Sequence, residues 1–101
     1  MKKMVITGAS GFLGRKLQEM AIEQGWKVLC INRHPSPGAI SFDDLNLESY
    51  LSEFAPKVIV HLAASYGAEA KGAGLHANLL LPVRLLQWGA DQHKIRFIAA
   101  G

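Results

Sequence analysis

Short apolar runs alternate with amphipathic stretches from one end of the chain to the other. The short runs are rich in valine, isoleucine and leucine, which is typical of buried β-strands. The five expected strands cover residues 3–7, 27–31, 39–42, 57–62 and 95–99. The longer stretches repeat apolar residues every three or four positions, which predicts amphipathic helices. The three expected helices cover residues 12–24, 47–55 and 75–92.

Residue types near the helix ends support these boundaries. The first helix is expected to bury one face, made of Leu13, Leu17, Met20 and Ala21. Gly25 follows it, and glycine commonly stops a helix. Asn46 is expected to cap the second helix with its side chain, and Pro56 is expected to end that helix.

Strands that are apolar on both faces and separated by helices indicate a parallel sheet covered on both sides. Because crossovers between parallel strands are right-handed, the expected strand order is 3-2-1-4-5. The sequence therefore predicts an α/β fold, a Rossmann-type doubly wound parallel sheet of five strands with flanking helices. No repeat, linker or low-complexity segment divides the chain, so residues 1–101 are expected to form one domain.

Composition narrows the classes of partner. Half of the 101 residues are hydrophobic and 19% are charged, as in a folded globular domain. The net charge of +3 is spread over scattered lysines and arginines, so no nucleic-acid partner is expected. No apolar run reaches the roughly 18 residues of a membrane span, so no membrane partner is expected. The single cysteine, Cys30, favours the reducing cytoplasm. Association into a homodimer is left open.

Three glycines, Gly8, Gly11 and Gly14, lie between the first expected strand and the first expected helix. Glycines in that place allow a tight turn, close approach of the backbone to a pyrophosphate, and close packing of the helix. Free backbone N–H groups and the positive end of the helix then face the anion. No Gly-Lys-Ser/Thr follows, which excludes a P-loop. The pattern predicts a dinucleotide site, and a glycine-rich turn without a ligand is the alternative.

The sequence Thr-Gly-Ala-Ser-Gly-Phe-Leu-Gly of residues 7–14 resembles the fingerprint of the extended short-chain dehydrogenase/reductase family, of the NAD(P)-dependent epimerase/dehydratase type. The likeness covers only the amino-terminal portion of the proteins in that family. It implies a fold that is truncated before the family's substrate-binding lobe. It also implies that the cofactor pyrophosphate is held around Gly8, Ser10, Gly11, Phe12, Leu13 and Gly14.

Asn32 and Arg33 follow the second expected strand. NAD-specific members of the family usually have an aspartate at the position of Asn32, where it binds the ribose hydroxyls and repels a 2′-phosphate. Asn32 removes that repulsion, and the Arg33 guanidinium suits a phosphate. We therefore expect NADP(H) to be preferred, with NAD(H) as the alternative. Stacking of Arg33 on the adenine, or its exposure to solvent, is the other interpretation of that residue.

The resemblance assigns the adenine end of the cofactor to Asp44 and Leu45. In the family's Asp-Leu/Ile step, the carboxylate meets the adenine amino group and the next backbone amide meets the ring. Asp43 is an adjacent competitor for this role. A carboxylate that merely precedes a helix is the alternative for Asp44.

Residues 58–64 resemble the family's fourth-strand signature. The resemblance places Leu62, Ala63 and Ala64 beside the ribose and pyrophosphate of the cofactor, where small side chains leave room. His61 precedes them, and in the family that position packs and hydrogen-bonds rather than acting as a base. The other histidines share no ligand spacing with it, so no metal site is expected.

Asn78 matches a frequent asparagine of the family's next helix. Because Pro82, four residues later, has no N–H, the carbonyl of Asn78 is left for a water or a partner. We infer a helper role for Asn78 in the proton path used by the catalytic residues. A helix kinked for packing is an equal alternative.

The family's catalytic residues are a Tyr-x-x-x-Lys pair and a Ser or Thr at the end of the fifth strand, with the tyrosine as general acid and base. Tyr50 and Tyr66 are not followed by lysine four residues later. The fifth expected strand reaches Gly101 before the catalytic hydroxyl. We therefore expect the catalytic residues beyond Gly101, and we expect this chain alone to bind cofactor without turnover.

Together these features predict the NAD(P)-binding segment of an epimerase, dehydratase or reductase that acts on a nucleotide sugar by hydride transfer. A non-catalytic NAD(P)-binding sensor or regulatory module is the alternative, and a reductase of small carbonyls is a weaker third. The incomplete sheet is expected to leave apolar surface uncovered, and marginal stability or self-association would follow.

Overall fold

The computed structural model describes residues 2–9, 11–32, 37–62, 81–90, 92 and 95–99. Helices and strands alternate in it as the hydrophobic pattern predicts, and each predicted strand end is placed within one residue. In chain order the elements are β1 (Lys3–Thr7), α1 (Phe12–Glu23), β2 (Lys27–Asn32), β3 (Ala39–Ser41), α2 (Leu47–Phe54), β4 (Val58–His61), α4 (Leu81–Ala90) and β5 (Arg96–Ala99).

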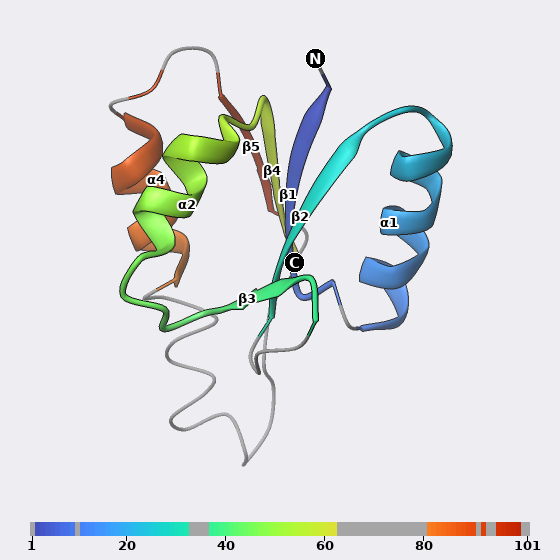
Figure 1. Cartoon of the computed structure of the whole chain (residues 1–101), viewed down its shortest axis with the longest axis horizontal. Coiled ribbons are helices and arrows are strands. Elements are labelled where there is room, and N and C mark those ends of the chain that lie inside the picture. The colour runs from blue at the N-terminus through green and yellow to red at the C-terminus, as the bar shows by residue number, and fades with distance from the viewer. Residues whose placement is uncertain are drawn as a thin grey trace.

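The strands form one sheet in the order β3-β2-β1-β4-β5, and every pair is parallel. β1 lies in the middle, with Val5 opposite Leu29 on one side and Ile59 on the other. Figure 1 shows α1 on one face of the sheet and α2 with α4 on the opposite face. This arrangement confirms the predicted doubly wound α/β fold.

The central strand divides the core into two layers, one on each side of the sheet. Val5 and Ile6 are both fully buried, and neighbouring strand residues point to opposite faces. Val5 packs in the cluster that includes Leu51 of α2 and Leu85 of α4, whereas Ile6 packs in the cluster that includes Ala21 of α1. Full burial of such a side chain contributes about 1.5–3 kcal/mol, so both faces stabilise the sheet.

The buried face of α1 differs from the predicted one. Leu13 and Met20, expected in the core, are 59% and 55% exposed. Ala21 is buried and Leu17 is partly buried, as predicted, and Gly14 is buried with them. The small residues let the helix approach the sheet closely. Because successive helical residues point about 100° apart, Leu13 and Met20 turn away when their small neighbours face the sheet.

The ends of α2 are set by residues just outside it. Asn46 occupies the N-cap position, but its side chain makes no capping hydrogen bond, so that prediction was wrong. The backbone N–H of Asn46 donates instead to Asp44 Oδ1 at 2.8 Å, and that carboxylate turns the chain into the helix. The helix ends before Pro56, as expected, at Ala55 in the left-handed conformation with φ of 54°. The residue before a proline is disfavoured in the right-handed helical region.

β5 lies at one end of the sheet and is only thinly covered. In the described part of the chain it pairs with β4 alone. Ile98 lies opposite Val60 in that ladder and is 45% exposed. The structure thus shows uncovered apolar surface at this end of the sheet, as the sequence led us to expect.

Candidate cofactor-binding site

The carboxyl ends of β1 and β4 lie side by side, and the chain leaves the two strands toward opposite faces of the sheet. Thr7 is opposite His61 in their ladder. The chain leaves β1 for α1 on one face, whereas α4, which follows β4, covers the other face (Figure 1). Ligands of doubly wound folds bind in the crevice at such a switch point. The next residues along the two strands, Gly8 and Leu62, therefore flank the candidate site.

Gly8 and Gly14 hold the glycine turn against the start of α1. Gly8 has φ of 74°, which glycine adopts without strain, and its N–H donates to the Ile31 carbonyl at 2.9 Å. A Cβ on Gly14 would lie 2.6 Å from Ala9 Cα and still closer to the Gly8 carbonyl oxygen. Gly14 is therefore required by the turn itself rather than by the strands beneath the helix, which refines its predicted role.

Gly11 leaves the amino end of α1 open. It is an exposed N-cap residue, and a Cβ there would meet only the Gly8 oxygen, at an ordinary 3.5 Å. In α1 as described, no side chain caps this end and no acidic residue lies in the first turn. The Phe12 side chain is 90% exposed and points away from the core. Because the first-turn N–H groups have no partner within a helix, this end suits an anion.

A buried hydrogen bond joins the ends of β1 and β4. Thr7 Oγ1 and His61 Nδ1 are 2.7 Å apart, and the Leu62 N–H donates to Thr7 Oγ1 at 3.1 Å. The His61 ring also stacks on Phe97 of β5, with the ring centroids 6.1 Å apart. His61 therefore packs and hydrogen-bonds, as the resemblance implied. Its contacts fix the spacing of the strands that flank the glycine turn.

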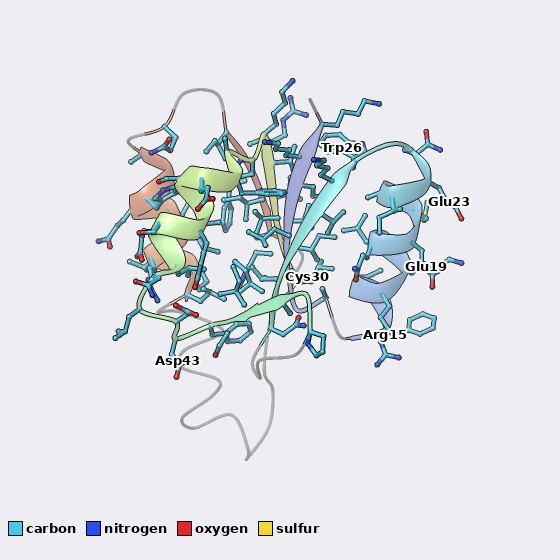
Figure 2. The ribbon with its side chains drawn as sticks, in the orientation of Figure 1. Arg15, Glu19, Glu23, Trp26, Cys30 and Asp43 are labelled. Atoms are coloured by element: carbon cyan, nitrogen blue, oxygen red, sulfur yellow. The ribbon has the colours of Figure 1, made fainter. Side chains whose placement is uncertain are left out.

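A hollow of about 240 Å³ lies beside the carboxyl end of β2. Asn32 and Cys30 line it from β2, and Arg15 and Gln18 line it from α1. Figure 2 shows Arg15 near the amino end of α1 and Cys30 on β2. Burial raises the pKa of the Cys30 thiol, so the thiol stays neutral. The Asn32 amide and the Arg15 guanidinium are the polar groups best suited to meet a ligand here.

Arg15 has no functional role in the sequence-based prediction, which placed it on the solvent face of the first helix. The structure does expose it, but at the rim of the hollow that Asn32 lines. The signal that points to it is its position directly after Gly14. A residue in the first turn of α1 necessarily lies close to the carboxyl edge of the sheet.

The loop between β3 and α2 lies at the same edge of the sheet and carries Asp44 and Leu45. The Phe42 N–H donates to the Asn32 carbonyl at 3.0 Å, which joins this loop to the end of β2. The Leu45 side chain is 92% exposed. The structure thus brings Asn32 and the predicted adenine residues to one edge, together with the glycine turn.

Asp44 and its neighbour Asp43 differ in their surroundings. Asp44 is partly buried, and its carboxylate is oriented by the N–H of Asn46. Asp43 is exposed and accepts a hydrogen bond from the Ser41 hydroxyl at 2.6 Å. Figure 2 shows Asp43 in this loop. Asp44 therefore does precede a helix, and a carboxylate with two oxygens can also accept a further donor.

Comparison with known proteins agrees with this geometry. The model of the NAD dependent epimerase/dehydratase family matches residues 4–101. The chain belongs to this family. The match confirms the resemblance that residues 7–14 carry.

Three proteins whose names or bound ligands include a nucleotide sugar are similar to the chain over most of its length. A GDP-L-fucose synthase of Azorhizobium caulinodans is 33% identical over 88 residues, 84% of this chain and 24% of that protein. A CDP-abequose synthase of Salmonella muenchen is 30% identical over 95 residues, 85% of this chain and 32% of that protein. MoeE5, solved in complex with UDP-glucose and NAD, superposes with a TM-score of 0.76 at 26% identity, over 98% of this chain and 36% of that one. The chain thus spans 24% to 36% of the length of these family relatives.

Several residues that the sequence assigned to the site lie outside the described residues. They are Ser10, Arg33, Ala63, Ala64 and Asn78, and their roles stay predictions. Among the residues that are described, no three His, Cys, Asp or Glu side chains gather as a metal site would require. No helix in this described part combines the length and apolar character needed to cross a membrane.

Proposed function

We propose that the chain binds the dinucleotide NAD(P)(H) at the carboxyl edge of its sheet. The glycine turn carries this proposal: Gly8 and Gly14 close the turn, while the exposed Gly11 leaves the amino end of α1 open at the switch point. The fold has no packing need for glycine at position 11, where a Cβ would make only ordinary contact. A pyrophosphate that approaches the backbone closely does need it. The residues present therefore fit this cofactor.

The proposed contacts follow the edge of the sheet. The pyrophosphate would be held at Ser10, Gly11, Phe12 and Leu13, the adenosine half by Asn32, Arg33, Asp44 and Leu45, and the other ribose beside Leu62, Ala63 and Ala64. When bound, the nicotinamide ring of the cofactor accepts or donates a hydride. The contribution of this chain is to bind and orient the cofactor on a rigid sheet edge.

We further propose that NADP(H) is preferred over NAD(H). Asn32 has no negative charge to repel a 2′-phosphate, and Arg15 lines the same hollow. Arg33 adds a second guanidinium directly after Asn32 in the sequence. MoeE5 was solved with NAD, so this preference would distinguish the chain from that relative.

The activity that we propose is hydride transfer on a nucleotide sugar, with this chain as the cofactor-binding segment of the enzyme. The relatives support this choice, because they are named for GDP- and CDP-linked sugars and MoeE5 binds UDP-glucose. The same names favour an enzyme over a non-catalytic sensor. Because these 101 residues hold no Tyr-x-x-x-Lys pair, we assign to the chain itself cofactor binding and no turnover.

Calorimetric titration of the full chain with NADPH tests the binding proposal. Gly11→Ala is expected to weaken binding about tenfold or more, because its Cβ projects toward the pyrophosphate. Its melting temperature is expected to change little, since that Cβ meets one atom at 3.5 Å. Gly89→Ala in α4 is the matched control, because nothing lies within 4 Å of the added Cβ. Failure of the wild type to bind, or unchanged binding by Gly11→Ala, would refute the proposal.

Arg15→Ala tests the choice between the two cofactors. The wild type is expected to bind NADPH about tenfold more tightly than NADH, as one charge-assisted phosphate contact provides. Arg15→Ala is expected to reduce this ratio to about threefold, with NADH binding unchanged. Lys16→Ala removes the next cation of α1, which is also exposed but does not line the hollow, and is expected to keep the ratio. Equal affinities of the wild type for NADPH and NADH would contradict the preference.

A further inference from the structure

The loop between β3 and α2 is held from α4 by one side chain, Arg84. Its Nη2 donates to the Asp44 carbonyl at 2.7 Å, and its Nη1 donates to the Phe42 carbonyl at 3.4 Å. Arg84 is 40 positions further along the chain than Asp44. The carbonyls on both sides of Asp43 are thus fixed by a residue from a different helix.

The guanidinium of Arg84 is itself fixed by Glu48 in the first turn of α2. Arg84 Nε donates to Glu48 Oε2 at 2.5 Å and Nη2 donates to Oε1 at 2.6 Å, a bidentate pair. The hydrogen bond from Arg84 holds the pKa of Glu48 below its ordinary value, so the pair is ionised at neutral pH. The two side chains are 25% and 43% exposed, and pairs so accessible to water add little stability. The pair therefore orients the Arg84 guanidinium more than it stabilises the fold.

A second contact between the two helices lies one turn further along. Trp88 Nε1 donates to Ser52 Oγ at 2.9 Å. Ser52 follows Glu48 by four residues, and Trp88 follows Arg84 by four residues. The helices α2 and α4 therefore run parallel, side by side on one face of the sheet (Figure 1). This second contact joins the helices without touching the loop. It provides an internal control for the first.

We propose that Arg84 is a positioning residue for adenine recognition, because it fixes the loop from which Asp44 hydrogen-bonds the adenine amino group. This inference rests on the proposed cofactor function. The planar fork of arginine reaches the Glu48 carboxylate and two loop carbonyls together, whereas lysine offers a single nitrogen. A loop that is fixed beforehand loses less conformational entropy when the ligand binds. Arg84 thereby raises the affinity for adenine without touching the ligand.

The test compares two dinucleotides that differ only in the base, NADPH and its hypoxanthine analogue, in which an oxygen replaces the adenine amino group. Titration of the full chain gives the ratio of their dissociation constants. In the wild type the adenine form is expected to bind about tenfold more tightly, the effect of one charge-assisted hydrogen bond. Arg84→Met, of similar length but uncharged, is expected to bring the ratio to within about twofold. Trp88→Phe is expected to lower the melting temperature and keep the ratio.

Arg84→Lys is the second variant, because it keeps a cation beside Glu48 but cannot span both carbonyls. Its ratio is expected to be about threefold, and it decides the test if Arg84→Met does not fold. Retention of the wild-type ratio in the folded Arg84 variants would overturn the inference, since Arg84 would then support only the fold. Equal binding of both dinucleotides by the wild type would also overturn it and leave the proposed function intact. A wild type that binds neither dinucleotide would refute the proposed function, and this inference with it.

Discussion

Replacement of Gly14 by alanine tests the packing of the glycine turn against α1. The added Cβ would lie 2.6 Å from Ala9 Cα and 3.0 Å from the Ala9 carbonyl carbon. Relaxed carbon–carbon contacts are roughly 3.5–4.0 Å long, so the helix and the turn must separate by about 1 Å. The obstacles are backbone atoms, which cannot rotate aside as a flexible side chain would.

The expected loss of stability is the difference between two opposing effects. Forcing an extra carbon into a packed site typically costs about 1–3 kcal/mol, and a backbone obstacle places Gly14→Ala at the upper end. Alanine favours the helix by about 1 kcal/mol relative to glycine, which offsets part of that cost. The net destabilisation is therefore about 2 kcal/mol. In a domain of this size it would lower the melting temperature by roughly 8–16 °C.

Urea and thermal unfolding, followed by circular dichroism, measure this effect. Gly89→Ala is the matched control, because it changes the same residue type within a helix with nothing within 4 Å of the new Cβ. The control is expected to gain about 0.5–1 kcal/mol from helix propensity alone. A Gly14→Ala variant that melts at or above the wild type would refute the close contact between the turn and the helix.

Four other positions test the stability of the chain, its pH dependence, the burial of its cysteine and its self-association. Ala55→Gly is expected to stabilise the chain against urea by about 0.5–1 kcal/mol, because glycine adopts the left-handed conformation without strain; Glu53→Gly, at an exposed position within the same helix, is expected to destabilise it similarly. The pKa of Glu48 is lowered in the folded state from 4.5, mainly by its hydrogen bond from Arg84. The stability that ionised Glu48 contributes is therefore present above pH 4.5 and is lost as the pH falls through the lowered pKa. The melting temperature of the wild type should therefore exceed that of Glu48→Gln near neutral pH, and the gap should narrow as the pH falls below 4.5. Burial raises the pKa of Cys30, so iodoacetamide should label it only as the chain unfolds, and rapid labelling of the folded chain would contradict this. Ile98→Lys is expected to reduce self-association in sedimentation velocity, because Ile98 is exposed at the uncovered end of the sheet; a wild type that stays monomeric at all concentrations would contradict this.

The strands, their order and the glycine turn can be predicted from the sequence because local chemistry dictates them. Continuous apolar runs such as residues 58–60 are stable only when both faces of the strand are covered, and the fixed hand of crossovers then leaves one strand order. Gly8 follows the same logic, since the turn after β1 requires φ of 74° and glycine adopts it without strain. The family fingerprint of residues 7–14 adds the expectation that a dinucleotide binds at this turn.

Features that depend on residues distant in the sequence were decided only by the tertiary structure. Periodicity alone favoured Leu13 and Met20 for the core, but close packing of Gly14 against the turn rotates both outward. The sequence shows Arg15 and Arg84 as two scattered cations. The fold places Arg15 beside Asn32 and joins Arg84 to the loop of Asp44. Residue types and their spacing thus determined the architecture and the place of the proposed site, whereas the partners of each charged side chain depend on which helix faces meet across the sheet.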